Sequence, residues 1–221
     1  MFSDPRLLTL AAWWIGYFAV HSLLASHGIK RRLAACCPRL ALRYRLFYTL
    51  TALVLILPPL HLLFTLSGPW LWRWEGWAGW VADLLGALAV VGFWISSRAY
   101  DLPVFFGLRP SRPIVTPETA APLRFSPAHR FVRHPWYFFG LLWLWTRDMN
   151  PPRLVTAVLV TLYVPIGTWL EERKLLAELG EPYRAYRRRV PALFPLPWKY
   201  LRKDEVPGAE SLNGPDHPGP G

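Results

Sequence analysis

Four long apolar blocks limit what this chain can fold into. They cover residues 7–25, 46–66, 78–97 and 154–170, and a shorter apolar run covers 136–146. A helix needs roughly 17 or more apolar residues to cross the hydrocarbon layer of a membrane. Together with a hydrophobic content of 53%, these blocks predict an all-α, polytopic membrane protein with about five transmembrane helices.

The basic residues are distributed unevenly among the segments that join these blocks. Six Lys/Arg and no acid lie in 26–45, six arginines and two acids lie in 98–135, and nine Lys/Arg lie in 171–203. The segment 67–77 has one arginine and one glutamate. With five spans, the three basic segments face the same side of the membrane. The positive-inside rule then predicts that the N-terminus is outside and the C-terminus is cytoplasmic.

The net charge of +11 therefore gathers at the membrane edge. This placement favours anionic membrane lipids as partners over nucleic acid. No protein partner is predicted.

The fourth apolar run is short. Its eleven residues, 136–146, reach roughly 16 Å as a helix, about half of the hydrocarbon core. Pro151 and Pro152 mark a turn after it, so the last two spans are predicted to form a short helical hairpin. An incomplete span is tolerated only where protein or water covers its backbone.

The character of the chain changes after residue 171. An amphipathic pattern is interrupted by Gly180, a typical helix stop, and Pro182 suits the first turn of a new helix. We therefore expect two short cytoplasmic helices. The stretch 204–221 is rich in Gly and Pro and is predicted to be a disordered tail, so that 1–203 form a single membrane-embedded domain.

Two basic residues and a proline introduce the short fourth run. Pro135 suits the first helical position, and the free N–H groups of such a terminus attract anions. Arg133 and His134 stand directly before it and add donors. The alternative is that both side chains are interfacial anchors that reach lipid headgroups.

Two adjacent acids, Glu171 and Glu172, follow the last span. Carboxylates in the last turn of a helix oppose its dipole and repel each other, so they require a partner. That partner is either a ligand with an amine and hydroxyls or a structural network with Arg133, Arg173 or Lys174. An anion site and a cation site at the two ends of one hairpin match a zwitterionic cofactor.

The stretches "VRHPWYFFG" and "LEERKLLAELGEPYRAYRRRVPALFP" closely resemble the C-terminal signature of the isoprenylcysteine carboxyl methyltransferase-like and phospholipid methyltransferase membrane enzymes. The stretches "HSLLASHGIKRRL" and "YDLPVFFGLRP" resemble the branch with methanethiol S-methyltransferases and NnrU-type proteins. The resemblance implies a membrane methyltransferase that uses S-adenosylmethionine, in a bacterial inner membrane.

The resemblance also implies a site, carried over by position. A nearby cation favours the thiolate form of a thiol acceptor, so Arg133 and Arg187 are the candidate catalytic residues, and the spacing does not choose between them. The candidate cofactor-binding residues come from both halves of the signature: His134, Pro135, Tyr137, Glu171, Glu172, Tyr183 and Tyr186.

The acceptor follows from the resemblance as well. We favour a small or lipophilic thiol, as in methanethiol S-methylation, with carboxyl O-methylation of a prenylcysteine or N-methylation of a phospholipid as alternatives. No sharp G-x-G precedes the hairpin, which argues against the phospholipid. A non-catalytic NnrU-like accessory protein is the alternative of another class.

The histidines within the apolar blocks are candidates in their own right. His21 lies inside the first block, and ionisable residues within membranes are often functional, so it is a candidate substrate residue. A hydrogen-bonded packing histidine is the alternative. A haem or quinone site is a further alternative, and it would need His21 together with His61, which lies in the second block near the opposite membrane face. His129 and His134 give only a weak metal signal, and no metal site is predicted.

Overall fold

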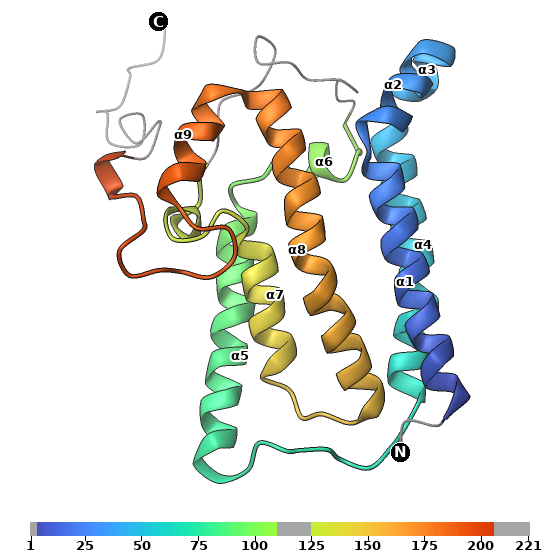
Figure 1. Cartoon of the computed structure of the whole chain (residues 1–221), viewed down its shortest axis with the longest axis vertical. Helices are drawn as coiled ribbons and strands as arrows, with labels where there is room; N and C mark the ends of the chain where they lie inside the picture. The colour runs from blue at the N-terminus through green and yellow to red at the C-terminus, as the bar shows by residue number, and fades with distance from the viewer. Residues whose placement is uncertain (1–3, 110–124, 206–221) are drawn as a thin grey trace, which may run out of the picture.

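The computed structural model describes residues 4–109 and 125–205, and within them all regular structure is helical (Figure 1). The long helices are α1 (Pro5–Ala25), α4 (Tyr44–Thr65), α5 (Gly76–Ser97), α7 (Pro135–Trp145) and α8 (Pro151–Leu179). The short ones are α2 (His27–Cys36), α3 (Pro38–Ala41), α6 (Leu102–Phe105), η1 (Pro127–Arg130), α9 (Glu181–Arg189) and η2 (Lys203–Glu205).

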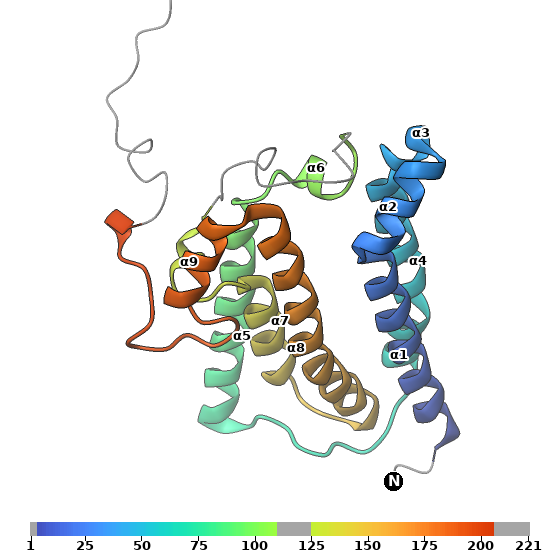
Figure 2. The same cartoon turned by 45° about the horizontal axis from the view of Figure 1, so that its top comes forward.

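Four helices, α1, α4, α5 and α8, are long and apolar enough to cross a membrane. They coincide with the four long apolar blocks and confirm the prediction of a polytopic all-α membrane protein. α1 packs along α4, and α5 packs along α7. α8 stands between these two pairs in both views (Figures 1 and 2).

α7 is the short fourth element and does not have the length of a full span. The prediction of about five spans is therefore close, with four full-length helices and one half-length helix. The loop between α4 and α5 folds against the turn that follows α7. Leu71 N–H donates to the Met149 carbonyl at 2.8 Å, and Trp74 N–H donates to Asp148 Oδ1 at 2.9 Å. Protein thus covers the end of the incomplete span.

α8 corrects one expectation about the cytoplasmic helices. The segment 171–179 is not a separate helix but the continuation of α8 to Leu179. No Gly or Pro interrupts residues 171–179, so the helix has no reason to end at the membrane edge. It ends at Gly180, whose φ of 63° favours glycine, and Pro182 lies in the first turn of α9 as predicted.

The two ends of the bundle differ in character. The N-terminus lies at one end, whereas α2, α6 and α9 lie at the other (Figure 1). All three basic segments therefore contribute residues to the end that carries α9. Of the predicted tail, Asp204 and Glu205 form part of η2, and residues 206–221 lie outside the described residues, as do 110–124 of the second basic segment.

A buried cluster stabilises each end. At the N-terminal end, Leu10 and Trp14 of α1 pack with Leu66, and the Trp14 indole N–H donates to Thr156 Oγ1 of α8 at 3.0 Å. At the other end, Tyr183 and Tyr186 of α9 are buried with Val190 and Leu201. The second cluster attaches α9 to the bundle and prepares the site.

Candidate active site

The segment before α7 is held by backbone hydrogen bonds to the chain that follows α9. Arg133 N–H donates to the Pro191 carbonyl at 2.9 Å, and His134 N–H donates to the Ala192 carbonyl at 3.0 Å. Pro135 then starts α7, as its fixed φ and missing N–H favour. The two basic side chains consequently point toward the C-terminal part of α8.

Arg133 forms a buried ion pair with Glu172. Its Nε donates to Glu172 Oε1 at 2.7 Å, and both side chains are only 8% exposed. Its Nη2 donates to the same Glu172 oxygen, and its Nη1 donates to the carbonyls of Arg187 and Val190. The second carboxylate oxygen of Glu172, Oε2, forms an ion pair with Arg187 Nε at 3.0 Å. Because both carboxylate oxygens are occupied, Glu172 acts as the structural anchor of this end of the bundle.

His134 lies between the two acids. Nε2 is 3.3 Å from Glu172 Oε1, and Nδ1 is 3.5 Å from Glu171 Oε2. Burial alone would lower the pKa of His134, but the hydrogen bonds and charges of the two carboxylates outweigh it and raise that pKa. An imidazolium is thereby favoured at the start of α7.

Glu171 differs from its neighbour because it remains open. Its Oε2 accepts a hydrogen bond from the Tyr137 hydroxyl at 3.0 Å, yet its side chain is 44% exposed. The Arg187 side chain is 46% exposed, and its Nε forms the ion pair with Glu172. One carboxylate and one guanidinium are therefore available to a ligand at the same end of α8.

The two candidate tyrosines of α9 are deeply buried. Tyr186 donates its hydroxyl to the His129 carbonyl at 2.7 Å. Tyr183 is 2% exposed, and its hydroxyl has no hydrogen-bond partner among the described residues. Burial raises the pKa of both phenols, so each remains protonated and able to donate. The orphaned Tyr183 hydroxyl is a polar group that a ligand can satisfy.

His129 has a structural importance that the sequence did not reveal. Its Nδ1 accepts from the Ser126 backbone N–H at 3.1 Å, and its Nε2 lies 3.3 Å from the Tyr100 hydroxyl. Burial lowers its pKa to about 4, so the ring is neutral near pH 7. The sequence signal that could have revealed this role is the pair Ser126 and His129, which forms a capping box at η1.

His21 lies on another helix pair. Its Nε2 is 2.8 Å from the Tyr48 hydroxyl of α4, and its ring stacks on Tyr17. His61 follows Tyr48 by 13 residues on α4, about 20 Å along the axis, so the two histidines cannot share one ligand. In the part of the chain that the structure describes, no group of three His, Cys, Asp or Glu residues is placed to hold a metal.

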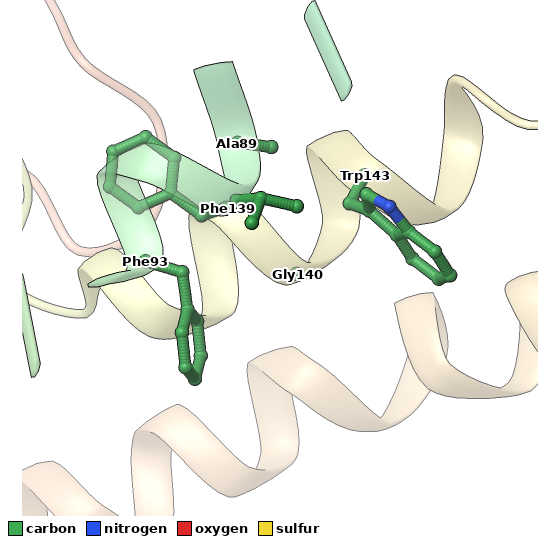
Figure 3. A pocket seen from close by; sticks show the side chains of 6 residues that line it. Ala89, Phe93, Phe139, Gly140 and Trp143 are labelled. Carbon is green, nitrogen blue, oxygen red and sulfur yellow. The ribbon is translucent and has the colours of Figure 1, made fainter. Parts of the chain in front are cut away.

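A separate apolar groove of about 230 Å³ opens between α5 and α7. In Figure 3, Phe93 and Trp143 flank the bare backbone of Gly140. All of its lining side chains are apolar: Ala89, Val90, Phe93, Phe139, Gly140 and Trp143. Because it offers no charged group, this groove does not suit a zwitterionic ligand.

The chain is similar to several bacterial enzymes. It is 31% identical over 208 residues to methanethiol S-methyltransferase 2 of Bradyrhizobium diazoefficiens, which covers 90% of this chain and 77% of the relative. It is 34% identical over 188 residues to the methanethiol S-methyltransferase of Crocosphaera subtropica, covering 82% and 72%. The enzyme of the same name from Mycobacterium tuberculosis is 32% identical over 199 residues, covering 84% and 77%.

No family model matches the chain, and no solved structure matches it. The relatives nevertheless span most of its length, and their resemblance agrees with the helical membrane architecture. The chain therefore belongs to the methanethiol S-methyltransferase family and is a membrane methyltransferase.

Proposed function

We propose that this chain transfers a methyl group from S-adenosylmethionine to methanethiol. The names of its relatives support a small thiol as the acceptor over a carboxylate or a phospholipid amine. The observation that carries the proposal is the open carboxylate of Glu171, held beside His134 at the start of α7. This is a site for a ligand that carries both signs of charge.

The residues at this end of α8 fit the methyl donor. Glu171 can accept from its amine or ribose hydroxyls, and Arg187 can donate to its carboxylate. The buried Tyr183 hydroxyl lacks a partner in the described part of the chain and can satisfy a further polar atom. Pro135 and Tyr137 shape the start of α7, whose N–H groups favour an anion. Tyr186 holds η1 in place through the His129 carbonyl.

Bound S-adenosylmethionine supplies an activated sulfonium methyl group. The task of the protein is then to align the acceptor and to exclude water. Arg133 positions Glu172 and thereby the end of α8, because all of its nitrogens are engaged with protein atoms. Arg187 is the more exposed cation and is the better candidate for direct contact with the donor.

The placement of the site follows the charge of the bundle. The basic segments gather at the end that carries α9, so this end faces the cytoplasm of a bacterial inner membrane and the N-terminus lies outside. The donor then reaches its site from the cytoplasm, and a small apolar thiol can arrive through the lipid.

The direct test uses the purified protein in detergent with S-adenosylmethionine labelled in its methyl group. We expect labelled dimethyl sulfide from methanethiol and little product from a prenylcysteine or from phosphatidylethanolamine. Isothermal titration should show saturable donor binding. Methylation of either larger acceptor without methylation of methanethiol would refute the assignment of the substrate.

A further inference from the structure

Four tyrosines from four helices converge on the side of α8 that carries Glu171; we refer to them as the tyrosine cluster. The Tyr48 hydroxyl lies 2.8 Å from Nε2 of His21, whose ring stacks on Tyr17. The Tyr137 hydroxyl donates to Glu171 Oε2 at 3.0 Å, and Glu171 follows Tyr163 by about two helical turns on α8. The members of the cluster come from α1, α4, α7 and α8: Tyr17, Tyr48, Tyr137 and Tyr163.

His21 borders this cluster on the α1 side. Its ring stacks on Tyr17 with centroids 5.5 Å apart, and its neighbour Ser22 lies 2.7 Å from the Tyr163 hydroxyl. Among the described residues, Tyr48 is the only hydrogen-bond partner of His21. The imidazole is therefore oriented by one phenol and joined through the cluster to the donor site.

The face of α8 between Tyr163 and Glu171 carries a glycine in place of a larger side chain. Gly167 occupies this face, four residues from each. The atoms nearest to a Cβ at Gly167 belong to the Tyr163 side chain, and the closest lies at 3.6 Å, an ordinary van der Waals distance. The aromatic rings beside this face of α8 favour a nearby sulfonium through cation–π attraction. A small thiol can fit against the apolar faces of the same rings.

We propose that the tyrosine cluster holds the acceptor thiol and that His21 is the base that accepts its proton. The inference rests on the proposed function and names the residue that activates its substrate. The S–H bond breaks, the proton passes to the unprotonated ring nitrogen of the neutral imidazole, and the electron pair remains on sulfur. The thiolate pair then forms the new carbon–sulfur bond, while the pair of the broken sulfonium bond stays with the donor. The imidazolium returns its proton to water.

The surroundings suit a base of this kind. Two titratable groups contact His21: Tyr17 on its own helix stacks on the imidazole, and Tyr48 on α4 hydrogen-bonds to it. Arg45 precedes Tyr48 by three residues on α4. Arg45 is engaged, since its Nε donates to the Phe105 carbonyl at 2.9 Å. General-base assistance of this type contributes typically about 10²- to 10⁴-fold to a rate.

The test compares a thiol with a selenol, because selenols are far more acidic and ionise without a base. We expect His21→Gln to lower kcat/KM for methanethiol about 100-fold or more at neutral pH and to leave methaneselenol near the wild-type value. Methanethiol activity should recover as the pH rises and the thiol ionises in solution. Isothermal titration should show unchanged affinity for S-adenosylmethionine.

Equal loss with both acceptors, at unchanged donor affinity, would overturn the inference and make His21 a packing residue. A wild-type protein that binds no donor would instead overturn the proposed function and the inference with it. Tyr48→Phe removes only the hydroxyl that orients the imidazole, so it should reproduce the selective loss of methanethiol activity in milder form. If Tyr48→Phe changes the activity toward both acceptors by the same factor, the role of His21 is again contradicted.

A second pair of variants tests whether methanethiol binds beside Gly167. Gly167→Leu fills the face between Tyr163 and Glu171 and should raise KM for methanethiol about tenfold or more. Gly16→Leu on α1 is the matched control, because a Cβ at Gly16 meets nothing within 4 Å. If Gly167→Leu retains the wild-type KM for methanethiol, the thiol does not bind in this space and the inference is wrong.

Discussion

Glu171 and Glu172 are adjacent in the sequence but have opposite surroundings in the fold. Successive helical residues point about 100° apart, so Glu172 faces α7 and α9 whereas Glu171 faces the tyrosine cluster. Glu172 is 8% exposed and pairs with two arginines, while Glu171 is 44% exposed. At the scale of single residues, one acid is therefore buried between two arginines and the other is partly open to solvent.

This division predicts different effects for two equivalent substitutions. Glu171→Gln should weaken the binding of S-adenosylmethionine about 10- to 100-fold, the value of one charge-assisted hydrogen bond, with little change in melting temperature. Glu172→Gln should lower the free energy of unfolding by about 3 kcal/mol or more, because it leaves the charge of Arg133 buried without its partner. Calorimetry and thermal unfolding in detergent separate the two effects; an equal loss of stability would contradict this division.

His129 predicts how stability depends on pH. Its pKa falls from 6.5 to about 4 on folding, so its contribution is complete above about pH 6.5 and is lost as the pH falls toward 4. The loss amounts to about 3 kcal/mol at the acid end. His129→Asn retains an acceptor for the Ser126 N–H but does not titrate. Thermal unfolding between pH 4 and 7 should show a shallower acid slope for the variant; identical slopes would exclude the contribution.

At the scale of helices, α7 depends on its neighbours because it is too short to cross a membrane alone. α5 provides the closest support. A Cβ added at Gly92 of α5 would overlap the ring of Phe139, so the glycine allows the two helices to approach. This contact orients the start of α7 and with it the segment that contains Arg133 and His134.

Gly92→Leu should therefore destabilise the protein by about 1–3 kcal/mol through overpacking. It should also lower donor affinity, since the start of α7 is displaced. Gly16→Leu provides a control of the same size at a position without neighbours. Thermal unfolding and donor titration of both variants test this, and equal stability of the two would show that the α5–α7 contact is not limiting.

At the scale of the whole molecule, charge and topology combine to separate two different ends. Cys36 and Cys37 are exposed near the end that carries α9, whereas Ser67 is exposed in the loop between α4 and α5. These positions report on opposite faces of the membrane. The natural cysteines are thus probes of the proposed orientation.

A maleimide that cannot cross membranes should leave Cys36 and Cys37 unlabelled in intact cells and label them after the cells are opened. Ser67→Cys, placed in a chain with both natural cysteines changed to serine, should be labelled in intact cells. The reverse pattern would show that the N-terminus is cytoplasmic and would place the site on the other face.

The membrane architecture could be predicted from the amino-acid order because each span is a local property. A helix in lipid satisfies its own backbone hydrogen bonds, so a long apolar block forms a helix whatever it contacts. The same reasoning identified the stop at Gly180 but not the unbroken path of α8 to Leu179. It also gave no means of choosing the partner of a short helix such as α7.

The chemistry of the site depended on contacts between distant residues. The sequence indicated Arg133, His134 and both glutamates as one set, but a linear pattern does not state which way each side chain points. The anchoring role of Glu172, the open position of Glu171 and the tyrosine cluster beside His21 follow from how α1, α4, α7, α8 and α9 pack. Burial and exposure at this end arise from side chains that meet across the bundle, and no single segment encodes them.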